Sequence, residues 1–220
     1  MKNEFAAVIF DLDGTLVDTE VVWHVAEDQL VRARGHIYTL EARSHLVGRR
    51  IEEGLVDLKA HYGFAETVEE LVEELNRNLL ALIDAEGVRL TPGMQDVLDW
   101  VIANDLPRAI ASASSEWFIE AVVHRMGWDE LFRVRCSCDH EAHGKPAPDV
   151  YLTAARRLGV DPTRCLAMED TINGARAAVA AGMTTYVVPD HRYTNADLLR
   201  QVTPHVFASM HEVYARLTGS

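Results

Sequence analysis

Residues 8–18 read VIFDLDGTLVD, an apolar run that ends abruptly in two carboxylates separated by one residue. The apolar run predicts a buried strand, and the acids that follow it predict a loop at the strand end. Side chains two positions apart on a strand point the same way, so Asp11 and Asp13 can face one reacting centre while Leu12 packs away from it. Gly14 allows the chain to turn sharply just after them.

Two carboxylates this close repel each other and should not titrate alike. A bound divalent cation or one proton held between them relieves the repulsion, and both arrangements suit catalysis. An Asp-Gly pair alone is typical of a simple turn. The hypothesis of a reactive site therefore depends on the full string and on its partners elsewhere in the chain.

The composition is that of a globular protein with no general affinity for polyanions. The chain has 220 residues, 48% of them hydrophobic, which is enough for one sizeable core or for a core domain with a smaller partner. Its 34 acidic against 21 basic residues give a net charge of −13. That charge argues against binding to nucleic acid or to anionic membrane surfaces. An anionic substrate would need a local basic site.

The cysteines and the hydropathy indicate the compartment. Cys136, Cys138 and Cys165 are an odd, sparse set, which argues against a disulfide framework and predicts a reducing compartment, the cytoplasm. No stretch approaches the roughly 18 apolar residues of a membrane span, so a soluble, unprocessed protein is expected. The oligomeric state cannot be read from the sequence, and the helices need no partner chain, so a monomer is compatible with it.

A run of helices is predicted between residues 18 and 88. The periodicity favours helices over 20–34, 39–47, 50–62 and 67–86, the last opened by a capping box from Thr67 to Glu70. No strand signal interrupts them. This segment is best interpreted as a helical bundle inserted into another domain, and we call it the cap.

Residues 1–17 and 89–220 are predicted to form the core. After residue 91, helices over 94–104, 115–126, 148–159 and 171–181 alternate with strands over 107–112, near 134, and over 164–168 and 183–188, and a polar helical tail covers 194–217. This alternation predicts a parallel sheet in a doubly wound, Rossmann-like α/β fold. Ligands of such sheets bind beyond the carboxyl ends of the strands, and the candidate residues there are Asp11, Ser112, Lys145 and the pair Glu169-Asp170.

In this order and spacing, these residues resemble the four motifs of the haloacid dehalogenase-like phosphohydrolases, across essentially the full chain. The layout of one strand and then a cap, with the Glu169-Asp170 ending, is most similar to the β-phosphoglucomutase-like branch, which includes sugar-phosphate phosphatases. The resemblance implies a magnesium-dependent phosphatase that hydrolyses a small phosphorylated metabolite, a sugar phosphate, through an aspartyl-phosphate intermediate.

The resemblance also assigns roles. Asp11 is the expected nucleophile and Asp13 the general acid and base. Magnesium is expected on Asp11, on the backbone carbonyl of Asp13 and on Asp170, with Glu169 as an outer-shell partner. Lys145 is the expected balancing cation. The hydroxyl of Ser112 and the amides of Ala113 and Ser114 are expected to hold phosphate oxygens, because amides at a strand-to-helix transition form an anion nest.

The cap is expected to contact the far end of the substrate. Gly48-Arg49-Arg50 aligns with the segment whose arginine does so in the resembling family; Arg50 is the expected contact and Arg49 the alternative. Mutases of that branch place a histidine in the first cap helix to work with the second aspartate. This chain has Trp23 at that spacing and His24 beside it, which favours a phosphatase over the alternative, a phosphomutase.

Three other interpretations are weaker. A signalling receiver domain also accepts phosphate on an aspartate, as a switch, but it lacks a helical insertion after its first strand. A haloacid dehalogenase attacks carbon and has no use for Asp13 as an acid. The segment containing Cys136, Cys138, His140 and His143 offers zinc ligands, but it lacks the two-residue gap of a zinc knuckle, and Cys136 is assigned to a strand.

Overall fold

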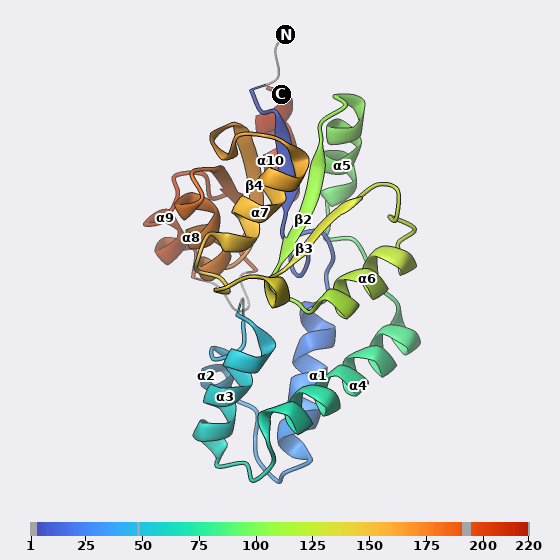
Figure 1. Ribbon diagram of the computed structural model, residues 1–220, viewed down its shortest axis with the longest axis vertical. Helices are drawn as coiled ribbons and strands as arrows, with labels where there is room; N and C mark the ends of the chain where they lie inside the picture. The colour runs from blue at the N-terminus through green and yellow to red at the C-terminus, as the bar shows by residue number, and fades with distance from the viewer. Residues whose placement is uncertain (1–3, 48, 191–194, 220) are drawn as a thin grey trace.

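The computed structural model describes residues 4–47, 49–190 and 195–219. Within these ranges five strands form one parallel sheet in the order β3-β2-β1-β4-β5 (Figure 1). The strands are β1 (Ala7–Phe10), β2 (Arg108–Ser112), β3 (Val134–Ser137), β4 (Cys165–Glu169) and β5 (Thr184–Val187). The predicted fold class is thus confirmed. Because β1 lies in the middle of the sheet, Asp11 leaves the sheet at its centre.

Helices cover both faces of the sheet. Val8 and Phe10 pack on the side of α5 (Met94–Ala103), α6 (Glu116–Arg125) and α10 (Met210–Thr218). Ala7 and Ile9 pack on the side of α7 (Asp149–Leu158) and α8 (Ile172–Ala180). All residues of β1 and β4 are buried, which explains why these strands are apolar without alternation, apart from Glu169 at the end of β4.

The cap consists of four helices beyond the carboxyl ends of the strands (Figure 1). They are α1 (Glu20–Arg32), α2 (Leu40–Arg43), α3 (Ile51–Tyr62) and α4 (Val68–Glu86), and both α1 and α3 pack against α4. The predicted capping box is present: Thr67 Oγ1 accepts from the amide of Glu70 at 3.2 Å, and Glu70 Oε2 accepts from the amide of Thr67 at 2.9 Å.

Two connections between cap and core run side by side. The amide of Asp18 donates to the carbonyl of Arg89 at 2.9 Å, and Val17 and Leu90 form an antiparallel bridge. The chain therefore leaves the sheet and returns to it at one place, next to the proposed boundaries. The division into residues 18–88 and the remainder stays a prediction.

Two predicted helices differ in the structure. The helix expected over 39–47 ends at Arg43 and continues as turns. The tail expected as one helix over 194–217 is two, α9 (Ala196–Arg200) and α10, and Thr194 lies outside the described residues. Between them the chain pairs with β5: Val187 donates to the carbonyl of His205 at 2.9 Å. Pro204 lies in this segment, and its ring is incompatible with a helix interior.

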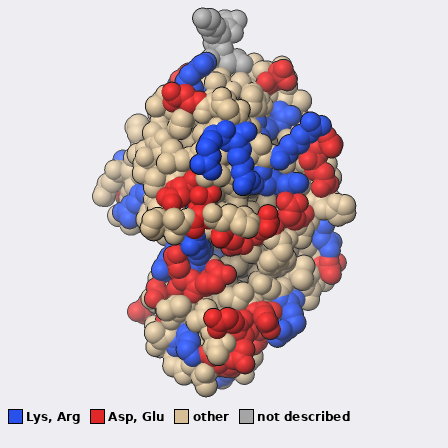
Figure 2. Space-filling view, viewed as in Figure 1, with Lys and Arg blue, Asp and Glu red and all other residues tan. Residues whose placement is uncertain are grey.

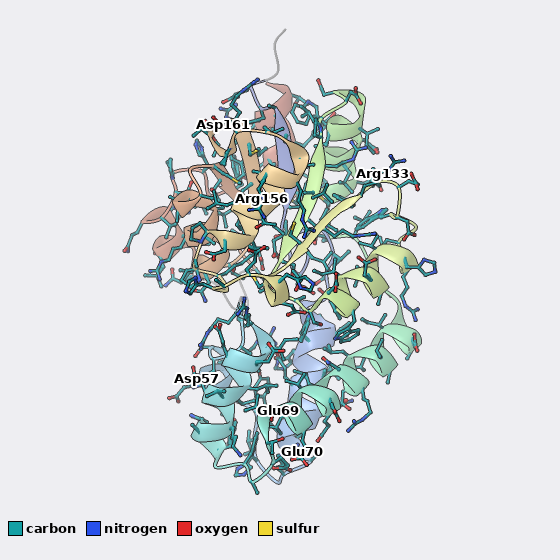
Figure 3. The ribbon with its side chains drawn as sticks, in the orientation of Figure 1. Asp57, Glu69, Glu70, Arg133, Arg156 and Asp161 are labelled. Carbon is teal, nitrogen blue, oxygen red and sulfur yellow. The ribbon has the colours of Figure 1, made fainter. Side chains whose placement is uncertain are left out.

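The surface of the cap is mixed, with exposed apolar side chains such as Leu40 and Val56 beside charged ones. Asp57, Glu69 and Glu70 project from its helices (Figure 3), and acidic side chains gather on it in the view of Figure 2. None of the helices in the described part of the chain is both long and apolar enough to cross a membrane. The two short 3₁₀ helices, η1 (Cys138–His140) and η2 (Pro162–Arg164), lie in loops of the core.

The packing of α4 can be tested with adjacent leucines. Leu79 is fully buried, whereas Leu80 is 40% exposed. We expect Leu79→Ala to lower the free energy of unfolding by about 2–5 kcal/mol, because it leaves a cavity in the cap interior. Leu80→Ala should cost about 0.5 kcal/mol. Urea unfolding of both variants checks this, and equal losses would contradict the orientation of α4.

Candidate active site

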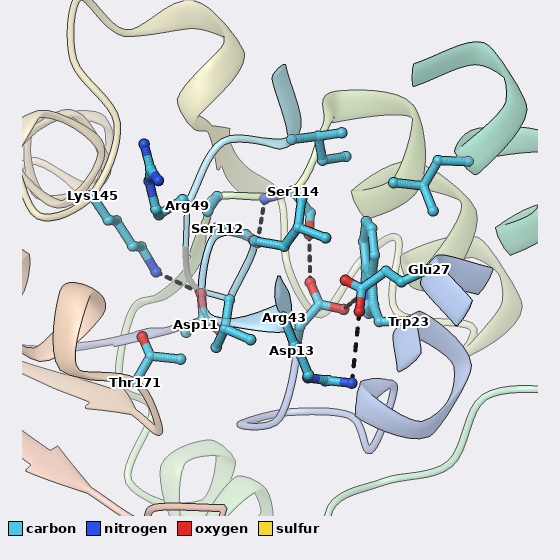
Figure 4. Close-up of a pocket in the computed structure, with 15 residues that line it drawn as sticks. Asp11, Asp13, Trp23, Glu27, Arg43, Arg49, Ser112, Ser114, Lys145 and Thr171 are labelled. Atoms are coloured by element: carbon cyan, nitrogen blue, oxygen red, sulfur yellow. Dashed lines mark hydrogen bonds and ion pairs between the residues drawn. The ribbon is translucent and has the colours of Figure 1, made fainter. Parts of the chain in front are cut away.

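The strand ends bring the predicted residues together at one edge of the sheet (Figure 4). Asp11 follows β1, Ser112 ends β2, and Glu169 ends β4, with Asp170 next in the chain. Lys145 enters from the loop between η1 and α7. All five side chains are buried. This follows from the parallel sheet, in which every carboxyl end points to the same side.

Lys145 lies between two carboxylates. Its Nζ is 2.6 Å from Asp11 Oδ1 and 2.6 Å from Glu169 Oε1. Burial alone would lower the pKa of Lys145, but the charges of Asp11 and Glu169 outweigh it and raise this pKa well above its ordinary value. Burial raises the pKa of Asp11, and Lys145 opposes that shift. The charged form of Lys145 is thus favoured beside the candidate nucleophile.

Glu169 is held in place by many donors. Its Oε1 also accepts from the hydroxyl of Tyr151 at 2.8 Å, and its Oε2 accepts from the amides of Asp170 and Thr171 at 3.1 and 3.2 Å. Gly174 of α8 lies so close that a Cβ there would fall 1.8 Å from Oε1. These contacts hold the Glu169 carboxylate against Lys145. Tyr151 was not predicted, since nothing in its spacing from Lys145 marks it.

Asp13 accepts hydrogen bonds from both the core and the cap. The hydroxyl of Ser114 donates to Oδ2 at 2.6 Å, while the hydroxyl of Thr19 and the indole of Trp23 donate to Oδ1 at 2.5 and 2.8 Å. Burial raises the pKa of Asp13, and these hydrogen bonds oppose the shift. Thr19 stands at the N-cap position of α1, but its side chain makes no cap bond there. Its hydroxyl serves Asp13 instead.

The segment after β2 makes its own local hydrogen bonds and lines the pocket. Ser112 Oγ accepts from the amide of Ser114 at 3.0 Å, and Ser137 Oγ donates to the carbonyl of Ser114 at 2.7 Å. Ser112, Ala113 and Ser114 line one pocket together with Asp11 and Lys145. Their binding of phosphate oxygens stays a prediction.

The acids at the strand ends fit a divalent cation. Carboxylate oxygens of Asp11, Glu169 and Asp170 lie within 4.8 Å of one another. Gly14 packs against Asp170 so closely that a Cβ would lie 2.3 Å from Oδ2. Hard oxygen ligands at this density suit a hard divalent cation. Asp170 is not the cap of α8, because Thr171 Oγ1 accepts from the amide of Gly174 at 3.1 Å.

The two cap arginines of the predicted substrate contact have different surroundings. Arg50 donates to the backbone carbonyls of Cys138 and Glu141, so it bridges cap and core. Arg49 lines the pocket, and its Nη1 lies 2.7 Å from Asp57 Oδ2. Gly48 lies outside the described residues. The expected substrate contact of Arg50, with Arg49 as the alternative, stays a prediction.

The pocket encloses about 630 Å³ of empty space, part of it open to solvent. Its cap wall includes two charged residues that the sequence did not suggest, Glu27 and Arg43. Glu27 follows Trp23 by one helical turn, so its spacing in α1 could have predicted that it faces the pocket. No feature of the sequence marked Arg43 as a pocket residue. His24 is not among the residues that line this pocket, and its ring centroid lies 5.5 Å from that of Tyr38.

The alternative zinc ligands do not come together. Cys136 belongs to β3, as predicted, and Cys138 is buried beside it, whereas His140 lies 3.0 Å from Glu116 and His143 lies 3.3 Å from Asp149. Burial raises the pKa of Cys136 to about 11, which disfavours the thiolate that metals bind. In the described ranges the acids at the strand ends are the one group that gathers metal-ligating side chains.

Comparison with known proteins agrees with this geometry. The haloacid dehalogenase-like hydrolase family matches residues 5–182. A "Probable pseudouridine-5'-phosphatase" from Drosophila melanogaster is 35% identical, over 84% of this chain and 81% of that protein. A fructose-1-phosphate phosphatase from Escherichia coli strain K12 is 33% identical, over 83% of this chain and 96% of that protein.

A solved structure supports the same assignment. CbbY from Rhodobacter sphaeroides, in complex with phosphate, superimposes with a TM-score of 0.85 at 28% identity, covering 95% of this chain and 96% of that one. The chain therefore belongs to the haloacid dehalogenase-like hydrolases, in the branch that is similar to the β-phosphoglucomutases and to sugar-phosphate phosphatases.

Proposed function

We propose that this phosphoric monoester hydrolase is a magnesium-dependent phosphatase that cleaves a small sugar phosphate through a phosphate ester on Asp11. One observation carries the proposal: Asp11 is paired with Lys145 while Asp13, held by three donors, lines the same pocket. A nucleophile, an acid and a cation are thereby available at one reacting centre.

Two half-reactions use the same pair of aspartates. The carboxylate of Asp11 attacks phosphorus and displaces the ester oxygen, which takes the proton of Asp13 and leaves as an alcohol. Asp13 then removes a proton from water, which attacks phosphorus and releases inorganic phosphate and free Asp11. The ammonium of Lys145 and the amides of Ala113 and Ser114 balance the charge that builds on the phosphoryl oxygens.

Asp11, Asp170 and the backbone carbonyl of Asp13 would hold magnesium, with Glu169 as an outer partner. The bound cation supplies positive charge that lets the Asp11 carboxylate approach an anionic phosphate. Two observations support Asp170 as a magnesium ligand: its side chain is buried, and Gly14 packs closely against it. Glu169 supports the arrangement indirectly, through Lys145.

The substrate class is proposed from the relatives and from the charge distribution. The similar phosphatases are named for pseudouridine 5′-phosphate and fructose 1-phosphate, both of which carry a sugar. The protein has a net charge of −13, so an anionic substrate depends on the cations that line this pocket, such as Lys145. A small phosphorylated metabolite is thus the best-supported substrate, with no role for nucleic acid.

Asp11→Asn should lower turnover of p-nitrophenyl phosphate by a factor of about 1,000 or more, since an amide is no nucleophile. Asp99→Asn is the control, because Asp99 is exposed on α5 and bonds only locally to Gln95 in the described contacts. Steady-state phosphate release measures both variants. Turnover by Asp11→Asn near that of wild type would refute the mechanism.

Removal of magnesium by a chelator should abolish activity, and added magnesium should restore it. Asp170→Ala should raise the magnesium concentration needed for half-maximal activity by about tenfold or more. Thermal unfolding without metal provides the comparison: removing one of several adjacent acids relieves repulsion there. A large loss of stability with unchanged magnesium dependence would instead give Asp170 a structural role.

The phosphomutase alternative is tested by its product. Trp23 meets Asp13 where mutases of the resembling branch place a histidine, and an indole N–H donates but cannot accept a proton from the acid. Glucose 1-phosphate supplied with its bisphosphate activator should therefore yield free phosphate and little isomer. Accumulation of the 6-phosphate isomer faster than phosphate release would favour the mutase.

A further inference from the structure

The cap end of the pocket contains a buried ion pair that the proposed chemistry does not use. Glu27 lies on α1 and Arg43 ends α2, and their side chains are 5% and 3% exposed. Arg43 Nη1 lies 3.6 Å from Glu27 Oε2. Both side chains line the pocket that contains Asp11 and Asp13 (Figure 4).

The pair lies one helical turn beyond Trp23, which contacts the candidate acid. Glu27 follows Trp23 by four residues, so the two side chains share one face of α1, and Trp23 donates to Asp13 at 2.8 Å. The hydroxyl of Tyr38 donates to Glu27 Oε2 at 2.7 Å and fixes that carboxylate. A leaving group released beside Asp13 would therefore extend toward Glu27 and Arg43.

Burying this pair is costly, because two charged side chains are taken out of water. A buried pair of this kind is weak evidence for stabilisation. The neighbouring cap wall includes the apolar residues Leu46, Val47 and Leu75. A few charged groups set in an apolar wall are typical of ligand orientation.

The charge of the pair indicates which ligand it suits. Its two charges sum to zero, and Arg49, the other cation on this wall, is paired with Asp57 at 2.7 Å. A second phosphate or a carboxylate would therefore meet the Glu27 anion without surplus positive charge. A neutral group with several hydroxyls suits both partners, since a hydroxyl donates to a carboxylate and accepts from a guanidinium.

We propose that Glu27 and Arg43 are specificity-determining residues that select a neutral polyhydroxyl leaving group, as in a sugar or sugar-alcohol monophosphate, over esters that carry a second anion. This inference rests on the proposed phosphatase activity and narrows its substrate class. The two residues act on the leaving group, whereas Asp11, Asp13 and Lys145 act on the phosphoryl group.

Two esters form a matched test. Sorbitol 6-phosphate and 6-phosphogluconate differ only at C1, the carbon farthest from the phosphate. This carbon belongs to a hydroxymethyl group in the first ester and to a carboxylate in the second. We expect the wild-type kcat/KM for sorbitol 6-phosphate to exceed that for 6-phosphogluconate by about tenfold or more. p-Nitrophenyl phosphate, which has no hydroxyl-bearing chain, serves as the reference substrate.

Variants of the pair should shift this preference in opposite directions. Glu27→Gln leaves the Arg43 cation uncompensated, so the relative kcat/KM for 6-phosphogluconate should rise by about tenfold. Arg43→Gln leaves the Glu27 anion uncompensated. The relative kcat/KM for 6-phosphogluconate should therefore fall below the wild-type value. Glu74→Gln is the matched control, because Glu74 pairs with Arg34 at 2.8 Å in the cap but does not line the pocket. It should leave the preference unchanged.

The outcomes separate this inference from the proposed function. If wild type hydrolyses none of the three esters with magnesium, the phosphatase proposal fails and the inference fails with it. If p-nitrophenyl phosphate is hydrolysed but the wild type uses the two hexose-derived esters equally, the inference alone fails. It also fails if folded Glu27→Gln keeps the wild-type preference. The wild-type comparison decides the matter even where a variant does not fold.

Discussion

The ion pairs of Lys145 with Asp11 and Glu169 are the interaction on which the site depends. One buried ammonium lies 2.6 Å from a carboxylate on each of two neighbouring strand ends. Removing one partner would leave a buried charge uncompensated, which is strongly unfavourable. The pairs therefore hold the loop after η1 against the ends of β1 and β4. In the proposed mechanism the same ammonium acts on the phosphoryl group, so one contact serves structure and chemistry.

Asp13 provides a second link, between cap and core. It accepts from Ser114 of the core and from Thr19 and Trp23 at the start of the cap. Arg50 adds a further bridge to the carbonyls of Cys138 and Glu141. The surroundings of the candidate acid thus depend on where the cap sits. This coupling is a physical reason why the proposed leaving-group contacts, Glu27 and Arg43, lie on the cap.

The local sequence pattern alone accounts for much of the fold. Val8 to Phe10 are buried on both faces of the sheet, which requires a continuous apolar run. This run allowed β1 to be predicted from the sequence. The capping box at Thr67 marked the start of α4 for a similarly local reason. The tail was mispredicted as one helix because the pairing of Val187 with His205 joins residues that are distant in sequence. A helical period in a polar segment carries no information about such pairing.

The sequence by itself determined the parallel sheet, the inserted helices and the set of acids and cations at the strand ends, because each follows from periodicity and from the shared direction of parallel strands. Only the tertiary structure decided which donors those acids meet. Tyr151 donates a hydrogen bond to Glu169, and Thr19 donates one to Asp13. Glu27 of α1 forms an ion pair with Arg43 of α2. These contacts depend on how helices pack and on side-chain direction, which spacing along one helix or strand does not encode.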